Sequence, residues 1–195
     1  IIKEILTASK LDDEKRLGEI LDEMRSRSRM RLEGASHSAA VARACSYFSP
    51  VRAFDDMTGG IEYFHFLEKT AAAYSKDENF RKELARKLKE TAGKLFAADN
   101  LMVSYTADEE GYKALPEELK KFKAALSSGP SKRYTFEFTP ELKNEGFKTS
   151  SKVNYVARCG SFDAEAYTGA LEVLKVIMNY EYLWQNLRVI GGAYG

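Results

Sequence analysis

The feature that most constrains the fold of this sequence is a long amphipathic segment between Asp77 and Phe96. Its apolar residues recur at the spacing of one helix face, while lysine, arginine and glutamate fill the remaining positions. The apolar members are Phe80, Leu84, Leu88, Leu95 and Phe96. Asp77 precedes the pattern as a natural N-cap, because its carboxylate can accept the free amides of a first helical turn. The segment therefore predicts a helix with one face turned toward the protein interior.

Four further stretches show helical periodicity. They span residues 11–32, 41–48, 109–126 and 167–178. Pro50 follows Ser49 and is expected to end the second stretch, since proline disfavours helix in the residue before it. Thr58 is expected in the N-cap region of a helix that begins near Ile61. Pro116 is expected near the start of the third stretch.

Apolar and polar residues alternate in three places, which is the period of a β-strand. The three segments are residues 101–106, 134–139 and 147–157. The first follows an expected turn at Asp99 and Asn100. The second can equally be an extended interdomain strap, since it follows a linker at residues 127–131. Helix-rich segments combined with such strands predict an α+β fold, with helix-rich layers on an antiparallel sheet.

The charge balance argues against nucleic acid or an anionic membrane as a partner. The 195 residues include 30 basic and 29 acidic ones, which gives a formal net charge of +1. Alternate positions of the first long helix hold arginine, at Arg25, Arg27, Arg29 and Arg31. Helical geometry spreads alternate residues around the cylinder, and no aromatic residues lie between them for base stacking. No apolar run approaches the roughly 20 residues that a membrane-spanning helix needs.

Neither histidine is expected to bind a metal. His65 and Glu68 approach the H-x-x-E-H pattern of a zinc-binding helix, but Lys69 stands where that pattern requires its second histidine. A protonated ammonium cannot be a zinc ligand, so this stretch predicts an ordinary helix face. Either Tyr63 and Phe64 or Leu67 would point inward, with Glu68 and Lys69 in water. His37 lies among small polar residues, with no other ligand type at a suitable spacing.

Cysteine usage gives neither a disulfide framework nor a zinc ligand set. The chain has two cysteines, Cys45 and Cys159, far apart in sequence. Both are expected to be free thiols, as in a reducing compartment.

The end of the sequence combines a diglycine with two hydrogen-bond donors. A helical run reaches Leu187, and Gly191 and Gly192 are expected to break it. Arg188 and Tyr194 flank the break, and such a pair on a rigid turn can grip a peptide carbonyl or a developing oxyanion. The alternative is structural: a glycine cap, an arginine in an ion pair and a half-buried tyrosine.

This final segment, Arg188-Val-Ile-Gly-Gly-Ala-Tyr-Gly195, resembles the R-V-x-G-G-A-Y-G segment of a known family. The family is that of the pitrilysin/insulinase-like zinc peptidases, or inverzincins, in their presequence-protease branch. Further stretches resemble the same branch in the same order, namely residues 44–50, 56–61, the step from helix to strand at 95–108, and 151–160. The resemblance implies the C-terminal half of such an enzyme.

The resemblance also implies an arrangement of domains within one half of a metallopeptidase clamshell. Residues 1–48 would be a linker helical arm with the first helices, and residues 49–130 the later part of a third α/β unit. Residues 131–195 would be a connecting strand and the opening of a fourth unit, which would be truncated. A truncated sheet has an unpaired edge, so self-association of such a fragment is expected.

The function implied by the resemblance is the degradation of short unstructured peptides. Arg188 and Tyr194 would contact the substrate and its oxyanion, and Gly191, Gly192 and Asn154 would line the substrate-binding site. The zinc and its H-x-x-E-H helix would lie in the N-terminal catalytic half, so this chain alone would hold no metal and be inactive. The alternative is an inactive scaffold subunit of the same family. The implied location is the cytoplasm for a bacterial protein and an organelle matrix for a eukaryotic one.

Overall fold

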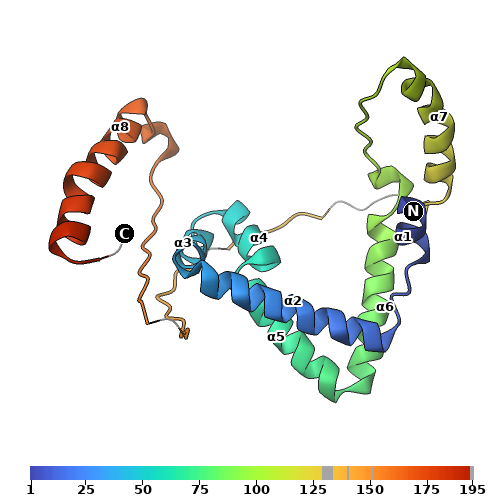
Figure 1. Ribbon diagram of the computed structural model, residues 1–195, viewed down its shortest axis with the longest axis horizontal. Coiled ribbons are helices and arrows are strands. Elements are labelled where there is room, and N and C mark those ends of the chain that lie inside the picture. The colour runs from blue at the N-terminus through green and yellow to red at the C-terminus, as the bar shows by residue number, and fades with distance from the viewer. Residues whose placement is uncertain (129–133, 140, 151, 194–195) are drawn as a thin grey trace. The chain divides into compact units, whose positions relative to one another are not determined.

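The computed structural model describes residues 1–128, 134–139, 141–150 and 152–193. The chain divides into two compact units, Ile1–Arg158 and Cys159–Gly195. Figure 1 labels the helices along the chain. Helices dominate the first unit: α1 (Ile2–Ala8), α2 (Glu14–Gly34), α3 (Ser36–Ser46), α4 (Pro50–Gly59), α5 (Ile61–Lys76), α6 (Glu78–Leu95), the short 3-10 helix η1 (Ala98–Asn100) and α7 (Glu109–Ala124).

The core of the first unit lies where α2 packs along α5, with α3 and α4 at one end of the pair (Figure 1). Leu67 of α5 is the most deeply buried large side chain, with 2% of its surface exposed. Of the inward-facing alternatives that the sequence leaves open, Leu67 is the buried one, while Tyr63 and Phe64 are partly exposed. Further along α5, the Tyr74 hydroxyl donates to the carbonyl of Glu14 at 2.8 Å, and a Cβ at Gly18 would lie 3.4 Å from the Tyr74 ring. The two helices are therefore in direct contact at Gly18 and Tyr74.

The amphipathic helix predicted from Asp77 onward is confirmed as α6. The Asp77 carboxylate accepts the amides of Asn79 and Phe80 at 2.8 and 3.2 Å, which makes Asp77 the predicted N-cap. At the other end the Asn100 amide donates to the Lys94 carbonyl at 2.8 Å, so the expected turn closes on the end of the helix.

The prediction for Pro116 is wrong, whereas the prediction that Ser49 and Pro50 end the helix before them is confirmed. Pro116 lies inside α7, well past its start, which is capped by Asp108. Pro50 begins α4 at its first turn, after the Ser49 hydroxyl accepts an amide of that turn, whereas the preceding helix already ends at Ser46. The N–H that proline lacks would have no partner in a first helical turn, so the same Ser-Pro pair ends one helix and favours the start of the next.

The predicted α+β fold is wrong: the described residues are largely helical and contain no strand. Their only sheet-like pairing is a single parallel bridge between Ala97 and Ser127. Segments 101–106, 134–139 and 152–157 are neither helical nor paired in a ladder. Alternating polarity predicts an extended backbone, but a strand also needs a neighbour about 4.8 Å away, and these segments have none within the described chain. The expected antiparallel sheet, and the sheet edge offered for self-association, are therefore not formed by these residues.

Residues 134–139, 141–150 and 152–158, which we call the strap, form neither helix nor strand and belong to the first unit. The strand interpretation of the aromatic segment at 134–139 is therefore wrong for the described residues, while the alternative of an interdomain strap stays a prediction. The linker predicted at residues 127–131 falls largely outside the described residues, which continue only to 128 on that side.

The second unit contains η2 (Ala164–Ala166), α8 (Gly169–Ile177) and η3 (Met178–Ile190). The helix predicted at 167–178 is confirmed as α8, and it continues directly into η3, a π-helix of 13 residues. A π-helix of this length is uncommon, since most are single turns and many of those lie at functional sites. Within the described chain, no helix is long and apolar enough to cross a membrane.

Candidate functional site

The diglycine ends η3, as the sequence predicts. The Gly192 amide donates to the Arg188 carbonyl at 3.1 Å, and the Ala193 amide donates to the Leu187 carbonyl at 2.9 Å. These bonds satisfy carbonyls that a helix end would otherwise leave without partners. Arg188 thus lies in the last turn of a helix whose end is held by its own backbone.

Both glycines are required by the geometry of this turn. A Cβ at Gly191 would lie 2.8 Å from the Leu187 carbonyl oxygen and 2.9 Å from that of Asn186, both of which are backbone atoms. Gly192 has a φ of +69°, in the left-handed region that other residues rarely adopt. The turn therefore brings the backbone of Gly191 closer to the carbonyls of the preceding turn than a side chain would allow. The absence of side chains at both glycines would also leave room for a ligand to approach the backbone.

The Arg188 guanidinium lies over the Trp184 ring, with 4.5 Å between the guanidinium carbon and the ring centroid. Arginine stacks on aromatic faces and donates its hydrogen bonds within its own plane. The indole therefore fixes the plane in which Arg188 can donate. No sequence signal other than the i, i+4 spacing points to this partner.

The predicted site residues fall into different parts of the structure. Arg188, Gly191 and Gly192 are brought together in one turn of the second unit. Asn154 is exposed and lies in the strap of the first unit. Tyr194 lies outside the described residues.

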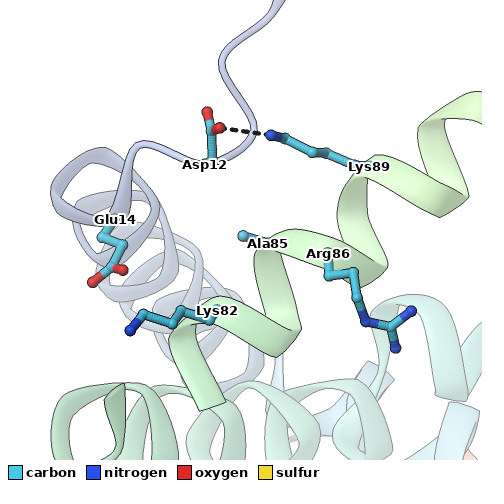
Figure 2. A pocket seen from close by; sticks show the side chains of 6 residues that line it. All are labelled: Asp12, Glu14, Lys82, Ala85, Arg86 and Lys89. Carbon is cyan, nitrogen blue, oxygen red and sulfur yellow. Dashed lines mark hydrogen bonds and ion pairs between the residues drawn. The ribbon is translucent and has the colours of Figure 1, made fainter. Parts of the chain in front are cut away.

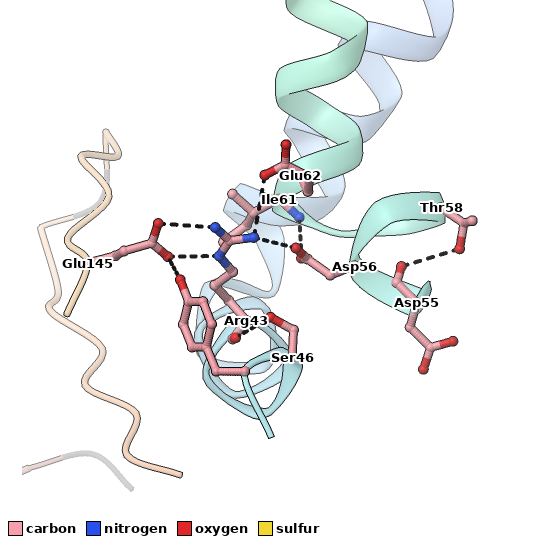
Figure 3. Close-up of polar contacts among 9 residues, drawn as sticks. Arg43, Ser46, Asp55, Asp56, Thr58, Ile61, Glu62 and Glu145 are labelled. Carbon is pink, nitrogen blue, oxygen red and sulfur yellow. Dashed lines mark hydrogen bonds and ion pairs between the residues drawn. The ribbon is translucent and has the colours of Figure 1, made fainter. Parts of the chain in front are cut away.

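A second polar cluster, which sequence analysis missed, surrounds Arg43 on α3 (Figure 3). Arg43 Nη1 donates to Asp56 Oδ2 of α4 at 2.6 Å, and Glu62 of α5 lies 3.5 Å from the same nitrogen. From the opposite side Arg43 Nε and Nη2 donate to the two carboxylate oxygens of Glu145 at 2.8 and 3.0 Å. The Tyr47 hydroxyl also donates to Glu145. One guanidinium thus joins three helices to the strap.

Asp56 occupies the buried side of this cluster, with 4% of its side chain exposed. Its Oδ1 accepts the amide of Ile61 at 2.9 Å, so Asp56, and not Thr58, serves the first turn of α5. The Thr58 prediction was wrong because Thr58 lies within α4, where its hydroxyl donates to the Phe54 carbonyl at 2.8 Å. A buried carboxylate needs such partners, and here a guanidinium and a backbone amide supply them.

Gly60 leaves room for the Asp56 carboxylate. A Cβ at Gly60 would overlap Asp56 Oδ1 and lie 2.8 Å from Asp56 Cα, a backbone atom that cannot rotate away. We therefore expect Gly60→Ala to lower the free energy of unfolding by about 1–3 kcal/mol, as overpacking does. Gly93→Ala is the matched control, because nothing lies within 4 Å of a Cβ at that position of α6. Urea unfolding followed by circular dichroism would measure both, and equal losses would contradict the clash.

The contacts in the Arg43 cluster shift the pKa values of Glu145 and Tyr47. The Arg43 hydrogen bonds lower the pKa of Glu145 from its ordinary value of 4.5 to about 2. Burial, followed by the hydrogen bond to Glu145, raises the pKa of Tyr47 from 10.0 to about 12. The pKa of Arg43 is raised, with its hydrogen bonds to Glu145 as the largest cause, so Arg43 stays charged.

These pKa shifts predict how the stability contributed by Glu145 and Tyr47 depends on pH. The folded state lowers the pKa of Glu145, so its contribution is complete above 4.5 and is lost as the pH falls toward about 2. The folded state raises the pKa of Tyr47, so that contribution is complete below 10.0 and is lost as the pH rises through about 12. We expect the stability difference between the parent protein and Glu145→Ala to be constant from about pH 5 to about pH 9. A difference that shrinks inside this range would contradict the assignment.

The distances along the chain explain why sequence analysis missed the cluster. Arg43 is 13 positions from Asp56 and 102 positions from Glu145. Residues so far apart leave no periodic signal. Locally, residues 56–60 indicate only that a helix begins near Ile61.

Several other charged side chains on the surface form ion pairs or hydrogen bonds within the protein. All four arginines of the alternating run have acidic or carbonyl partners, namely Asp22 for Arg25, Glu23 for Arg27, Glu68 for Arg29 and the Gly59 carbonyl for Arg31. A groove of about 320 Å³ lies between α6 and the start of α2 (Figure 2). Its wall is spanned by a 2.6 Å pair between Lys89 and Asp12. Mixed charges that already pair with one another offer little to a ligand of one sign.

The described residues contain no group of three or more histidine, cysteine or acidic side chains that could hold a metal ion. Each histidine instead lies beside an aromatic ring of the strap. His37 is 5.8 Å from Tyr155 and His65 is 6.2 Å from Phe147, measured between ring centroids. A zinc ion therefore does not fit the residues described in this chain.

Comparison with known proteins gives one consistent picture. Residues 1–69 match the family model described as peptidase M16, subfamily C, associated. Over its whole length the chain is 30% identical to protein HypA of Clostridium perfringens, of which it covers 20%. It is 27% identical over 98% of its length to presequence protease 1, chloroplastic/mitochondrial, of Arabidopsis thaliana, covering 18% of that protein. It is 28% identical over 84% of its length to the mitochondrial presequence protease of Yarrowia lipolytica, covering 17%.

The chain thus spans about a fifth of the length of the curated relatives that it matches. No solved structure matches it. The match to the associated domain and the matches to presequence proteases agree with each other. The chain therefore belongs to the M16 peptidase family, in the C-terminal region of its presequence-protease branch.

Proposed function

We propose that this chain is part of the non-zinc half of a zinc metallopeptidase that degrades short unstructured peptides. In this proposal Arg188 and Tyr194 donate hydrogen bonds to the substrate, and Gly191 and Gly192 let the peptide backbone come close. The observation that carries the proposal is the turn that ends η3, where the stacked Arg188 and two sterically required glycines lie together. The membership of the chain in a peptidase family supports it.

The chemistry asked of this chain is electrostatic. As water adds to a peptide carbonyl, negative charge grows on the oxygen, and donors held in advance at that position lower the barrier. Arg188 would bind the substrate carbonyl with a guanidinium whose plane is fixed by Trp184. The Tyr194 phenol would donate to the same developing oxyanion. Zinc would supply Lewis-acid activation of water in the full-length protein, from ligands outside the residues described.

The partners proposed for the chain follow from this role. They are peptide substrates and the N-terminal catalytic half of the same polypeptide, with Asn154 as a further substrate contact. Residues 1–48, 49–130 and 131–195 would belong to successive parts of the parent enzyme. Two of the relatives are named as mitochondrial or chloroplastic proteins. We propose an organelle matrix for this protein if its source is eukaryotic and the cytoplasm if it is bacterial.

The proposal is tested by peptide hydrolysis with the full-length protein and its Arg188→Ala and Tyr194→Phe variants. Strong loss of turnover at unchanged zinc content is the expected result. Normal turnover in both variants would remove the two residues from the mechanism. If the parent protein itself fails to cleave unstructured peptides, the scaffold alternative replaces the enzyme.

A further inference from the structure

The strap is attached to the helices of the first unit at several points along its length. Phe136 lies against Phe54 of α4 with 6.3 Å between ring centroids, in an edge-to-face arrangement. Further along, Phe147 lies beside His65 of α5 at 6.2 Å. Aromatic pairs of this kind contribute modestly, and the strap rings remain about half exposed: 48% for Phe136 and 43% for Phe147. These aromatic contacts are too weak to hold the strap in place by themselves.

The strongest attachment is Glu145. Its carboxylate takes two parallel hydrogen bonds from Arg43, at 2.8 and 3.0 Å, and a third from the Tyr47 hydroxyl. Its side chain is 26% exposed although most of the strap around it is open to solvent, and that of Arg43 is 15% exposed. A bidentate pair between guanidinium and carboxylate fixes direction as well as distance. Glu145 therefore fixes where the strap lies on the helices and which residue of the strap faces Arg43.

The helical side of this contact does not depend on Glu145. Without Glu145, Arg43 would keep Asp56 at 2.6 Å and Glu62 at 3.5 Å, and Asp56 would keep the Ile61 amide. Figure 3 shows Glu145 approaching Arg43 from the side opposite Asp56. The strap can therefore be released while the helices stay packed, which makes the contact separable by mutation.

The strap is also the covalent connection to the second unit. It carries Asn154, and its last residue, Arg158, is followed directly by Cys159 of the unit that contains Arg188. We infer that Glu145, held by Arg43 and Tyr47, is a positioning residue for the peptidase, which fixes the segment leading to the substrate-binding turn. This inference rests on the proposed function of Arg188. It assigns Glu145 no contact with substrate.

The test compares Glu145→Ala with Glu141→Ala in the full-length protein. Glu141 is the matched control because it belongs to the same strap and its partner is an exposed strap lysine, Lys143, at 2.9 Å. Two quantities are measured: the rate of tryptic cleavage after Lys148 in the strap, and kcat/KM for an unstructured peptide. Cleavage of a folded protein follows the population of the locally opened form.

Glu145→Ala is expected to raise strap cleavage about tenfold or more, since it removes hydrogen bonds between charged groups. It is expected to lower kcat/KM between about tenfold and about a hundredfold, the range for a small misplacement of a reacting group. Glu141→Ala should change neither quantity. In an Arg43→Gln background Glu145→Ala should have a much smaller further effect, because the two Arg43 hydrogen bonds are already lost and only the one from Tyr47 remains.

Two results would overturn the inference: strap cleavage that does not change, or faster cleavage with unchanged kcat/KM. Equal losses of kcat/KM in Glu145→Ala and Glu141→Ala would also overturn it. The Arg188→Ala variant separates this outcome from failure of the proposed function. If Arg188→Ala keeps full activity, the function of the turn is wrong, while the cleavage rates still report whether Glu145 holds the strap.

Discussion

Replacing Arg188 with alanine in the full-length enzyme is expected to lower kcat by about two to three orders of magnitude, as loss of one oxyanion donor does. The physical reason is that the guanidinium is already oriented, by the Trp184 ring at 4.5 Å and by the closed end of η3. Its alignment is therefore in place before substrate binds and needs no rearrangement in the transition state. Steady-state hydrolysis of an unstructured peptide measures the effect.

Further variants separate orientation from charge. Arg188→Lys keeps a positive charge but loses the planar donors, so it should recover only part of the activity. Tyr194→Phe should also lower kcat, while zinc content by metal analysis stays at the parent value in each variant. Arg27→Ala is the control for removal of an arginine, since Arg27 is an exposed residue of α2 paired with Glu23. A variant of Arg188 that changes KM alone would indicate ground-state binding and contradict the oxyanion role.

Replacing Arg43 with leucine is expected to destabilise the protein by about 3–5 kcal/mol, the loss seen when one partner of a buried ion pair is removed. Asp56 would keep its buried carboxylate, with 4% of the side chain exposed, and only the Ile61 amide to satisfy it. Glu145 would lose its bidentate partner at the same time. The free energy of urea unfolding, followed by circular dichroism, measures this change.

The matched control is Arg52→Leu on α4. Arg52 lies 3.5 Å from Asp55, and both side chains are more than half exposed, so its removal should change stability by no more than about 0.5 kcal/mol. Arg43→Leu with Asp56→Leu should be less harmful than Arg43→Leu alone, because no buried charge is then left without its partner. A double variant that is worse than the single one would show that the ion pair is not the source of the loss.

The helices were predictable because their signals are local. Asp77 marks the start of α6, and the apolar stripe behind it gives most of the length. The diglycine at 191 and 192 ends η3 as predicted, since the backbone conformation at Gly192 is one that glycine adopts easily. What the sequence could not show was the π-helical geometry of η3 or the stacking of Arg188 on Trp184, both of which depend on three-dimensional arrangement.

The sheet was predicted but is not formed by the described residues, and the Arg43 cluster is formed but was not predicted, for a common reason. A period of two at residues 101–106 reports a backbone conformation, and a strand exists only where a second segment pairs with it. In the same way Arg43, Asp56 and Glu145 each look like ordinary surface charges in the sequence. Their burial and pairing are properties of three helices and the strap after folding, and no local pattern encodes them.

The overlap between Gly60 and the Asp56 carboxylate has a consequence for how relatives of this protein should diverge. Because any larger residue at 60 displaces the carboxylate that receives Arg43, the three positions must change together or stay as they are. This constraint comes from packing, so natural selection should maintain it in lineages that have given up proteolysis as well as in active ones. We expect a homologue that keeps these three residues but has lost the counterparts of Arg188 and Tyr194 to fold normally and to have no peptidase activity.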